Sequence, residues 1–126
     1  MINPKNLHLT ISAIIITVVS LAYGLFPDNI LPRIFDFTIV STDLKQVFRS
    51  TMGLYLGMVL LWVIGIFKSV HWRTATITNV VFMFGLSAGR IISLVIDGIP
   101  SISFSIGLAL ELILGFWGII NLKKYK

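Results

Sequence analysis

The stretch Gly85–Ser101, GLSAGRIISLVIDGIPS, places one arginine inside an apolar run that ends in an Asp-Gly and proline turn. An arginine at the centre of a membrane-spanning helix costs about 2.5–3.5 kcal/mol to insert, so Arg90 needs a partner. Glu111 is the one carboxylate that lies well inside another apolar segment of the sequence. We therefore expect Arg90 and Glu111 to form the buried polar centre of a small helical membrane protein.

The composition indicates a lipid environment. Of the 126 residues, 56% are hydrophobic and 12% are charged, whereas a soluble domain carries about 25% charged residues. The length allows one domain, 1–126. The net charge of +5 comes from short basic tracts between apolar runs, so nucleic acid is not an expected partner. Cysteine is absent, which excludes disulfides and thiol chemistry.

Four apolar segments are long enough to cross about 30 Å of hydrocarbon as helices. They lie at about 7–26, 48–67, 74–96 and 101–120, and they predict an all-α bundle of four transmembrane helices. The connection at 28–47 mixes charged and apolar residues, which predicts an interfacial segment that lies along the bundle or caps it. Ser41 or Thr42 is a suitable N-cap for a helix that starts near Asp43 and continues into the second span.

The basic residues predict the orientation. Six cations lie at the two termini and in the 68–73 turn, against three on the opposite side, Arg33, Lys45 and Arg49. The positive-inside rule then places both termini in the cytoplasm. A cleaved secretory signal is the rival interpretation of the first span, because Ser-Leu-Ala at 20–22 resembles a small-x-small cleavage site.

Depth and helical face both favour the Arg90–Glu111 pair. Arg90 lies seven residues, about 10 Å, from Asp97, and Glu111 lies ten residues, about 15 Å, from Ser101. Since an arginine side chain bends along the helix axis, the two charges can meet in the outer half of the bundle. Glu111 shares its face with glycines that let a neighbouring helix approach closely, at Gly107, Gly115 and Gly118.

The remaining polar groups of the outer half complete a candidate ligand site. Its members are Arg90, Glu111, Asp97, Arg49, Tyr55, Ser93 and Asn79. We expect Arg49 to reach Asp97 or Glu111, and Tyr55 to supply a hydroxyl donor. Structural interpretations stay open beside these: the Arg90–Glu111 pair as a pin that fixes helix register, Asp97 as a turn residue, Arg49 as an interfacial anchor and Asn79 as a helix–helix hydrogen bond.

The sequence assigns no catalytic residue, no metal ligand set and no cofactor. His8 and His71 are two possible ligands without a third, which is a poor basis for a metal site. An intramembrane enzyme with Glu111 or Asp97 as general acid or base is the least supported class, because the sequence has no Ser–His arrangement and no cofactor motif.

Two segments resemble a known family. Phe48–Gly57 (FRSTMGLYLG) and Gly89–Pro100 (GRIISLVIDGIP), followed by Glu111, are similar to the DUF4345 family of small four-helix bacterial membrane proteins. The resemblance implies the fold and topology, and it implies no residue roles because the family's function is unknown. A looser likeness to the DoxX-like four-helix proteins rests on architecture.

Three functions follow as alternatives. The first is a binding or accessory protein whose polar centre holds a small polar or lipid headgroup ligand. The second is a small oligomeric transporter or channel with Glu111 as the coupling carboxylate. The third is a structural partner subunit in which Arg90 and Glu111 act as a register pin. The expected partners are membrane lipids, a small polar ligand, and a second copy or another membrane protein. The expected location is the bacterial cytoplasmic (inner) membrane.

Overall fold

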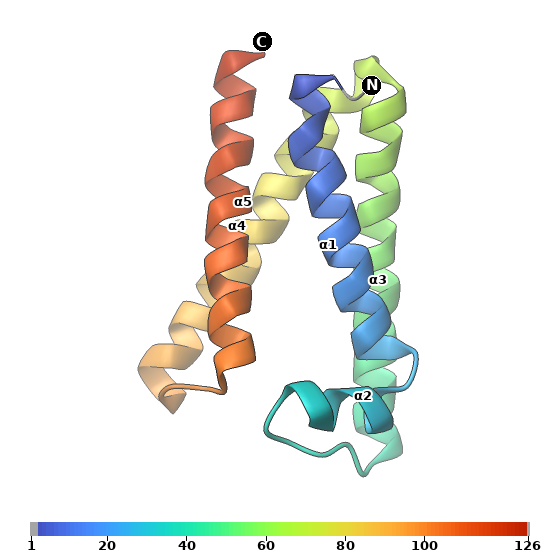
Figure 1. The fold of residues 1–126 in the computed structure, drawn as a ribbon, viewed down its shortest axis with the longest axis vertical. Coiled ribbons are helices and arrows are strands. Elements are labelled where there is room, and N and C mark those ends of the chain that lie inside the picture. The colour runs from blue at the N-terminus through green and yellow to red at the C-terminus, as the bar shows by residue number, and fades with distance from the viewer. Residues whose placement is uncertain (1–2, 126) are drawn as a thin grey trace.

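The computed structural model describes residues 3–125, and these form five α-helices without a β-strand (Figure 1). The helices are α1 (Leu7–Gly24), α2 (Pro27–Ile34), α3 (Thr42–Phe67), α4 (Trp72–Asp97) and α5 (Ile102–Lys124), with short 3₁₀ turns at Pro4–Asn6 and Ser69–His71. All except α2 are long and apolar enough to cross a membrane. The predicted all-α fold with four spans is therefore confirmed.

Both described ends of the chain lie at one end of the bundle, which we call the terminal end (Figure 1). The Asn6 side chain donates to the carbonyl of Ile66 at 3.2 Å, and the Trp72 indole donates to the carbonyl of Lys5 at 3.0 Å. These bonds hold the start of the chain against the α3–α4 turn. The side of the membrane on which this end lies stays a prediction.

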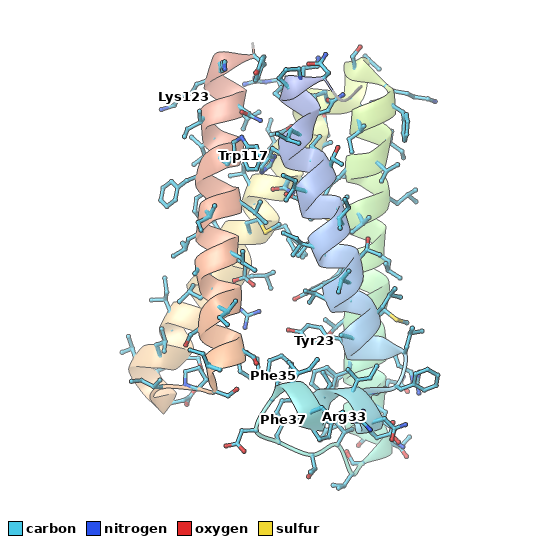
Figure 2. The ribbon with its side chains drawn as sticks, viewed as in Figure 1. Tyr23, Arg33, Phe35, Phe37, Trp117 and Lys123 are labelled. Carbon is cyan, nitrogen blue, oxygen red and sulfur yellow. The ribbon has the colours of Figure 1, made fainter. Side chains whose placement is uncertain are left out.

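The connection between α1 and α3 contains a short helix that the sequence did not distinguish from the rest of the segment. Pro27 starts α2, with Asp28 in the first turn, and Leu31 is completely buried. After α2 the chain has no regular secondary structure up to Ser41, and the ring of Phe35 stacks on Phe104 of α5 with centroids 4.2 Å apart. The segment thus lies across one end of the bundle, the α2 end, where Figure 2 labels Phe35 and Phe37.

The predicted N-cap of α3 is confirmed. The Ser41 hydroxyl accepts a hydrogen bond from the backbone N–H of Leu44 at 3.1 Å, and Asp43 lies in the first turn. The helix begins at Thr42, so its first turns precede the apolar span predicted from residue 48. At the other end of the molecule, α5 continues to Lys124, past the predicted limit of the fourth span at residue 120.

Helices α4 and α5 pack closely along the glycine face predicted for the fourth span. A methyl group on Gly115 would lie 2.9 Å from the Phe84 ring, and one on Gly118 would lie 2.5 Å from Val80. These glycines therefore set the distance between the two helices. The close packing brings Glu111 of α5 against the neighbouring face of α4, where Arg90 lies.

Candidate functional site

Arg90 and Glu111 form a charge-assisted hydrogen-bonded pair between α4 and α5. Arg90 Nε donates to both carboxylate oxygens, at 3.0 and 2.9 Å, and Nη2 donates to Oε1 at 2.9 Å. The Glu111 side chain is 8% exposed and that of Arg90 is 21% exposed. The predicted contact between the two charges is confirmed, and their separation is short enough for each to compensate the other away from water.

The pair uses one edge of the guanidinium and leaves the N–H groups of the other edge to different partners. Glu111 is bound by Nε and Nη2, and the Tyr23 side chain lies close enough to the guanidinium to interact with its remaining N–H groups. Arg90 also lies over the ring of Phe104, with its guanidinium carbon 5.6 Å from the centroid. The Arg90–Glu111 pair is thus neutral as a unit and still offers hydrogen-bond donors at Nη1.

A cavity of about 480 Å³ lies beside the pair. Its wall is largely apolar and aromatic, and its polar groups come from Tyr55, Arg90, Ser93 and Ser105 together with Tyr23. Tyr23 projects from the last turns of α1 at the α2 end, as Figure 2 shows. A volume of this size, with few polar groups converging in an apolar wall, is typical of a small-molecule site.

A second cavity, of about 260 Å³, lies between α1, the α2 segment, α4 and α5. It contains Glu111 in its wall and shares five wall residues with the first cavity. The shared residues are Tyr23, Tyr55, Leu86, Arg90 and Phe104. Arg90 therefore has access to both cavities. Tyr23 and Phe104 were not singled out from the sequence, because an aromatic residue in an apolar helix usually indicates packing.

The prediction that Arg49 pairs with Asp97 or Glu111 is wrong. Arg49 Nη1 donates to the carbonyls of Gly24 and Leu25, at 2.8 and 3.1 Å. These carbonyls lie at the C-terminal end of α1, where no following helical turn supplies backbone N–H donors. A nearby arginine therefore donates to them. Arg49 thus holds the end of α1 against α3 and is absent from the walls of both cavities.

Asp97 also lines neither cavity. It is exposed at the last residue of α4 and accepts a hydrogen bond from the Ser93 hydroxyl at 2.7 Å. Gly98 follows with φ +94, a backbone conformation that favours glycine. This geometry agrees with the turn role left open for Asp97. Ser93 remains at the site, because it lines the larger cavity.

Asn79 does not form the predicted helix–helix hydrogen bond. It is completely buried nearer the terminal end, and neither amide atom has a partner among the described residues. A buried histidine, for which the sequence predicted no such role, makes an interhelical bond instead. His8 Nε2 lies 2.8 Å from the carbonyl of Leu114, and since a carbonyl accepts, the imidazole donates. The sequence indicated His8 only as one of two possible metal ligands, because its position near the start of a span does not reveal which face of the helix it occupies.

The geometry defines the class of protein: a helical membrane protein with four potential spans and a paired arginine and glutamate inside the bundle. The family is shown by comparison with known sequences. The model of a domain of unknown function, DUF4345, matches residues 5–122, nearly the whole chain. The chain therefore belongs to the DUF4345 family. The searches of curated proteins and of solved structures found no match. The likeness to DoxX-like proteins stays a prediction.

Proposed function

We propose that this protein binds a small molecule in the cavity beside the Arg90–Glu111 pair. The supporting observation is that a cavity of about 480 Å³ meets the only side-chain ion pair between α4 and α5 in residues 3–125. A pair that served only to fix the register of two helices would need no such space. The apolar wall favours a ligand with an apolar body, and Arg90 Nη1 and the nearby hydroxyls favour one polar end.

The site that we propose differs from the one expected from the sequence. It omits Arg49 and Asp97, which line neither cavity, and it adds Tyr23 to Arg90, Glu111, Tyr55 and Ser93. Asn79 contributes to the core rather than to the cavity wall. We further propose that the protein lies in a bacterial inner membrane with both termini in the cytoplasm, which the distribution of basic residues supports.

The register pin remains a second candidate role for the pair. Each oxygen of Glu111 is satisfied by Arg90, and the carboxylate is almost completely buried. An ion pair of this kind can specify helix register without any ligand. A transporter role is not favoured by a particular contact.

A substitution that fills the larger cavity distinguishes the ligand-binding role from the register-pin role. Gly89 lines the larger cavity, and a methyl group there would have no described atom within 4 Å, so Gly89→Leu should occupy the cavity without disturbing the pair. Gly57 is equally open but lines neither cavity, so Gly57→Leu is the matched control.

The measurement is native mass spectrometry of protein extracted with its surrounding lipid in polymer nanodiscs. We expect a tightly bound molecule on the wild type and on Gly57→Leu, and its loss from Gly89→Leu while that variant stays folded. If no variant carries a bound molecule, including the wild type, the binding function is wrong and the pin is favoured.

A further inference from the structure

The second cavity indicates where the ligand comes from. It extends along α5 from Ser103 to Leu114 and lies between two hydrogen-bonded links. At one end the Ser103 hydroxyl donates to the carbonyl of Ile34 at 2.7 Å, and at the other His8 donates to Leu114. The cavity therefore occupies the stretch where α1 and α5 are not joined by a hydrogen bond among the described residues.

The wall of this cavity includes side chains on the outer surface of the bundle. Val18 of α1 is 63% exposed, and Ile106 of α5 is 54% exposed. Both belong to helices that are long and apolar enough to span a membrane, so their exposed surfaces face acyl chains rather than water. The cavity thus opens sideways, between α1 and α5, to the lipid.

The charge balance of the Arg90–Glu111 pair, at the inner end of this cavity, restricts the charge of the ligand. Arg90 and Glu111 sum to zero, and Glu111 takes the Nε–Nη2 edge, which is one of the two guanidinium edges that can bind a carboxylate or phosphate in a bidentate manner. An added anion would leave a net negative charge in a low-dielectric region, which is unfavourable. An uncharged group with carbonyl or hydroxyl oxygens adds no charge and can accept from Nη1.

The two cavities suit different parts of one molecule. The smaller one is lined mostly by aliphatic side chains, such as Ile15, Val19 and Leu110. The larger one has the hydroxyl groups of Ser93 and Ser105 and lies toward the helix ends. A hydrocarbon chain fits the smaller cavity and a polar head fits the larger, with Arg90 between them.

We infer that the ligand is an uncharged, single-chain amphiphile of the monoacylglycerol type that enters from the bilayer between α1 and α5. This inference rests on the proposed function, because it assigns a chemical class and an entry route to the ligand of the same site. Its polar head lies against Arg90 Nη1, and its chain lies along α1 and α5.

The test uses two photoreactive probes with the same chain in phosphatidylcholine nanodiscs: a diazirine-bearing monoacylglycerol and the matching ionised fatty acid. Specific labelling is the fraction that an excess of unlabelled monoacylglycerol removes. We expect specific labelling by the monoacylglycerol within residues 15–22 and 103–110, and labelling by the fatty acid that is weaker by about tenfold or more.

Two matched substitutions test the entry route. Ile106→Trp adds bulk at the opening, whereas Ile113→Trp adds it on the outer surface of the same helix, at a residue that is 61% exposed and lines neither cavity. We expect Ile106→Trp to reduce specific labelling about tenfold and Ile113→Trp to leave it unchanged. Melting temperatures of both variants show whether the fold is intact.

The outcomes separate this inference from the proposed function. Equal or stronger specific labelling by the fatty acid overturns the uncharged ligand, and equal labelling of Ile106→Trp and wild type overturns lateral entry. In both cases a molecule that is retained by the wild type and lost in Gly89→Leu leaves the proposed function intact. The absence of specific labelling by either probe overturns the inference, while the Gly89→Leu comparison still decides whether the site binds anything.

Discussion

Arg90 and Glu111 show that a charged residue inside an apolar bundle needs a partner of opposite charge. Each charge is costly alone, and the sequence offered Arg90 one well-buried carboxylate at a similar depth. Their contact could therefore be predicted. The role of Arg49 could not, because the unpaired carbonyls at the end of α1 compete for it and the sequence does not show how close they lie.

Removing the polar groups of two buried residues near the terminal end should change the free energy of unfolding in opposite directions. Asn79 has no partner among the described residues, whereas His8 donates to Leu114. We expect Asn79→Leu to raise the free energy of unfolding by about 1 kcal/mol, because a buried, unpaired amide is replaced by an apolar group. We expect His8→Leu to lower it by about 1 kcal/mol through loss of the bond.

Unfolding titrations in mixed detergent micelles measure both changes. A lower stability of Asn79→Leu would show that the amide has a partner in the folded protein, as the sequence suggested.

At the scale of the element, glycine positions decide which helices meet. The glycines at 115 and 118 face α4, where an added methyl group would collide with Phe84 or Val80. Gly53 and Gly57 of α3 have the GxxxG spacing, yet a methyl group on either would have no described atom within 4 Å. The sequence predicted close packing at the glycine face of the fourth span, but since small residues recur on α3 as well, it could not show that no helix packs closely against Gly53 and Gly57.

Replacing glycine by alanine should therefore have opposite effects on stability at the packed glycine face of α5 and at the open glycine face of α3. Gly118→Ala places a methyl group 2.5 Å from Val80 and 3.1 Å from the His8 ring, and we expect it to lower the free energy of unfolding by about 1–3 kcal/mol. Gly57→Ala meets no described atom and should raise it by about 0.5–1 kcal/mol through helix propensity. Equal effects in unfolding titrations would contradict the close packing of α4 and α5.

The end of α1 depends on a side chain from another helix. We expect Arg49→Met to lower stability by about 1 kcal/mol and to speed amide hydrogen exchange in the last turn of α1, because two carbonyl partners are lost. Lys45→Met is the control, since the pair between Lys45 and Asp28 is long, at 3.6 Å, and exposed. Exchange that is unchanged in Arg49→Met would show that its bonds do not hold the helix end.

Helix α2 marks a limit of prediction at this scale. The segment was predicted to be interfacial from its mixture of apolar and charged residues, but eight residues with two prolines give too short a pattern to indicate a helix. Its place is set by tertiary contacts, among them the stacking of Phe35 on Phe104. The four long helices could be predicted without knowledge of tertiary contacts, because their length and hydropathy are sufficient to indicate potential spans.

At the scale of the whole molecule, the four potential spans and the position of both described chain ends at one end of the bundle follow from the order of apolar and basic segments. The cavities do not, because they depend on how α1 and α3 sit relative to α4 and α5 near the α2 end (Figure 1). The sequence thus predicted the polar centre but not the space beside it. Tyr23 joined the site for the same reason.

Orientation in the membrane can be tested cleanly because the chain contains no cysteine. Val70 in the α3–α4 turn is 81% exposed and Ile99 in the α4–α5 turn is 91% exposed. In right-side-out vesicles we expect an impermeant maleimide to label Ile99→Cys, and to label Val70→Cys after permeabilisation. The reverse pattern would invert the topology, and labelling of both from one side would contradict four complete spans.

The most direct test of the polar centre is a double-mutant cycle on Arg90 and Glu111, measured by unfolding titration. Arg90→Met and Glu111→Leu should each lower the free energy of unfolding by about 3–5 kcal/mol, because each leaves an unpaired charge inside the bundle. The double variant should be more stable than either single variant, since no charge is left uncompensated. Arg49→Met combined with Glu111→Leu should give additive losses, because Arg49 contacts α1 instead. Additive losses for Arg90→Met and Glu111→Leu would contradict a coupled pair at the centre of the bundle.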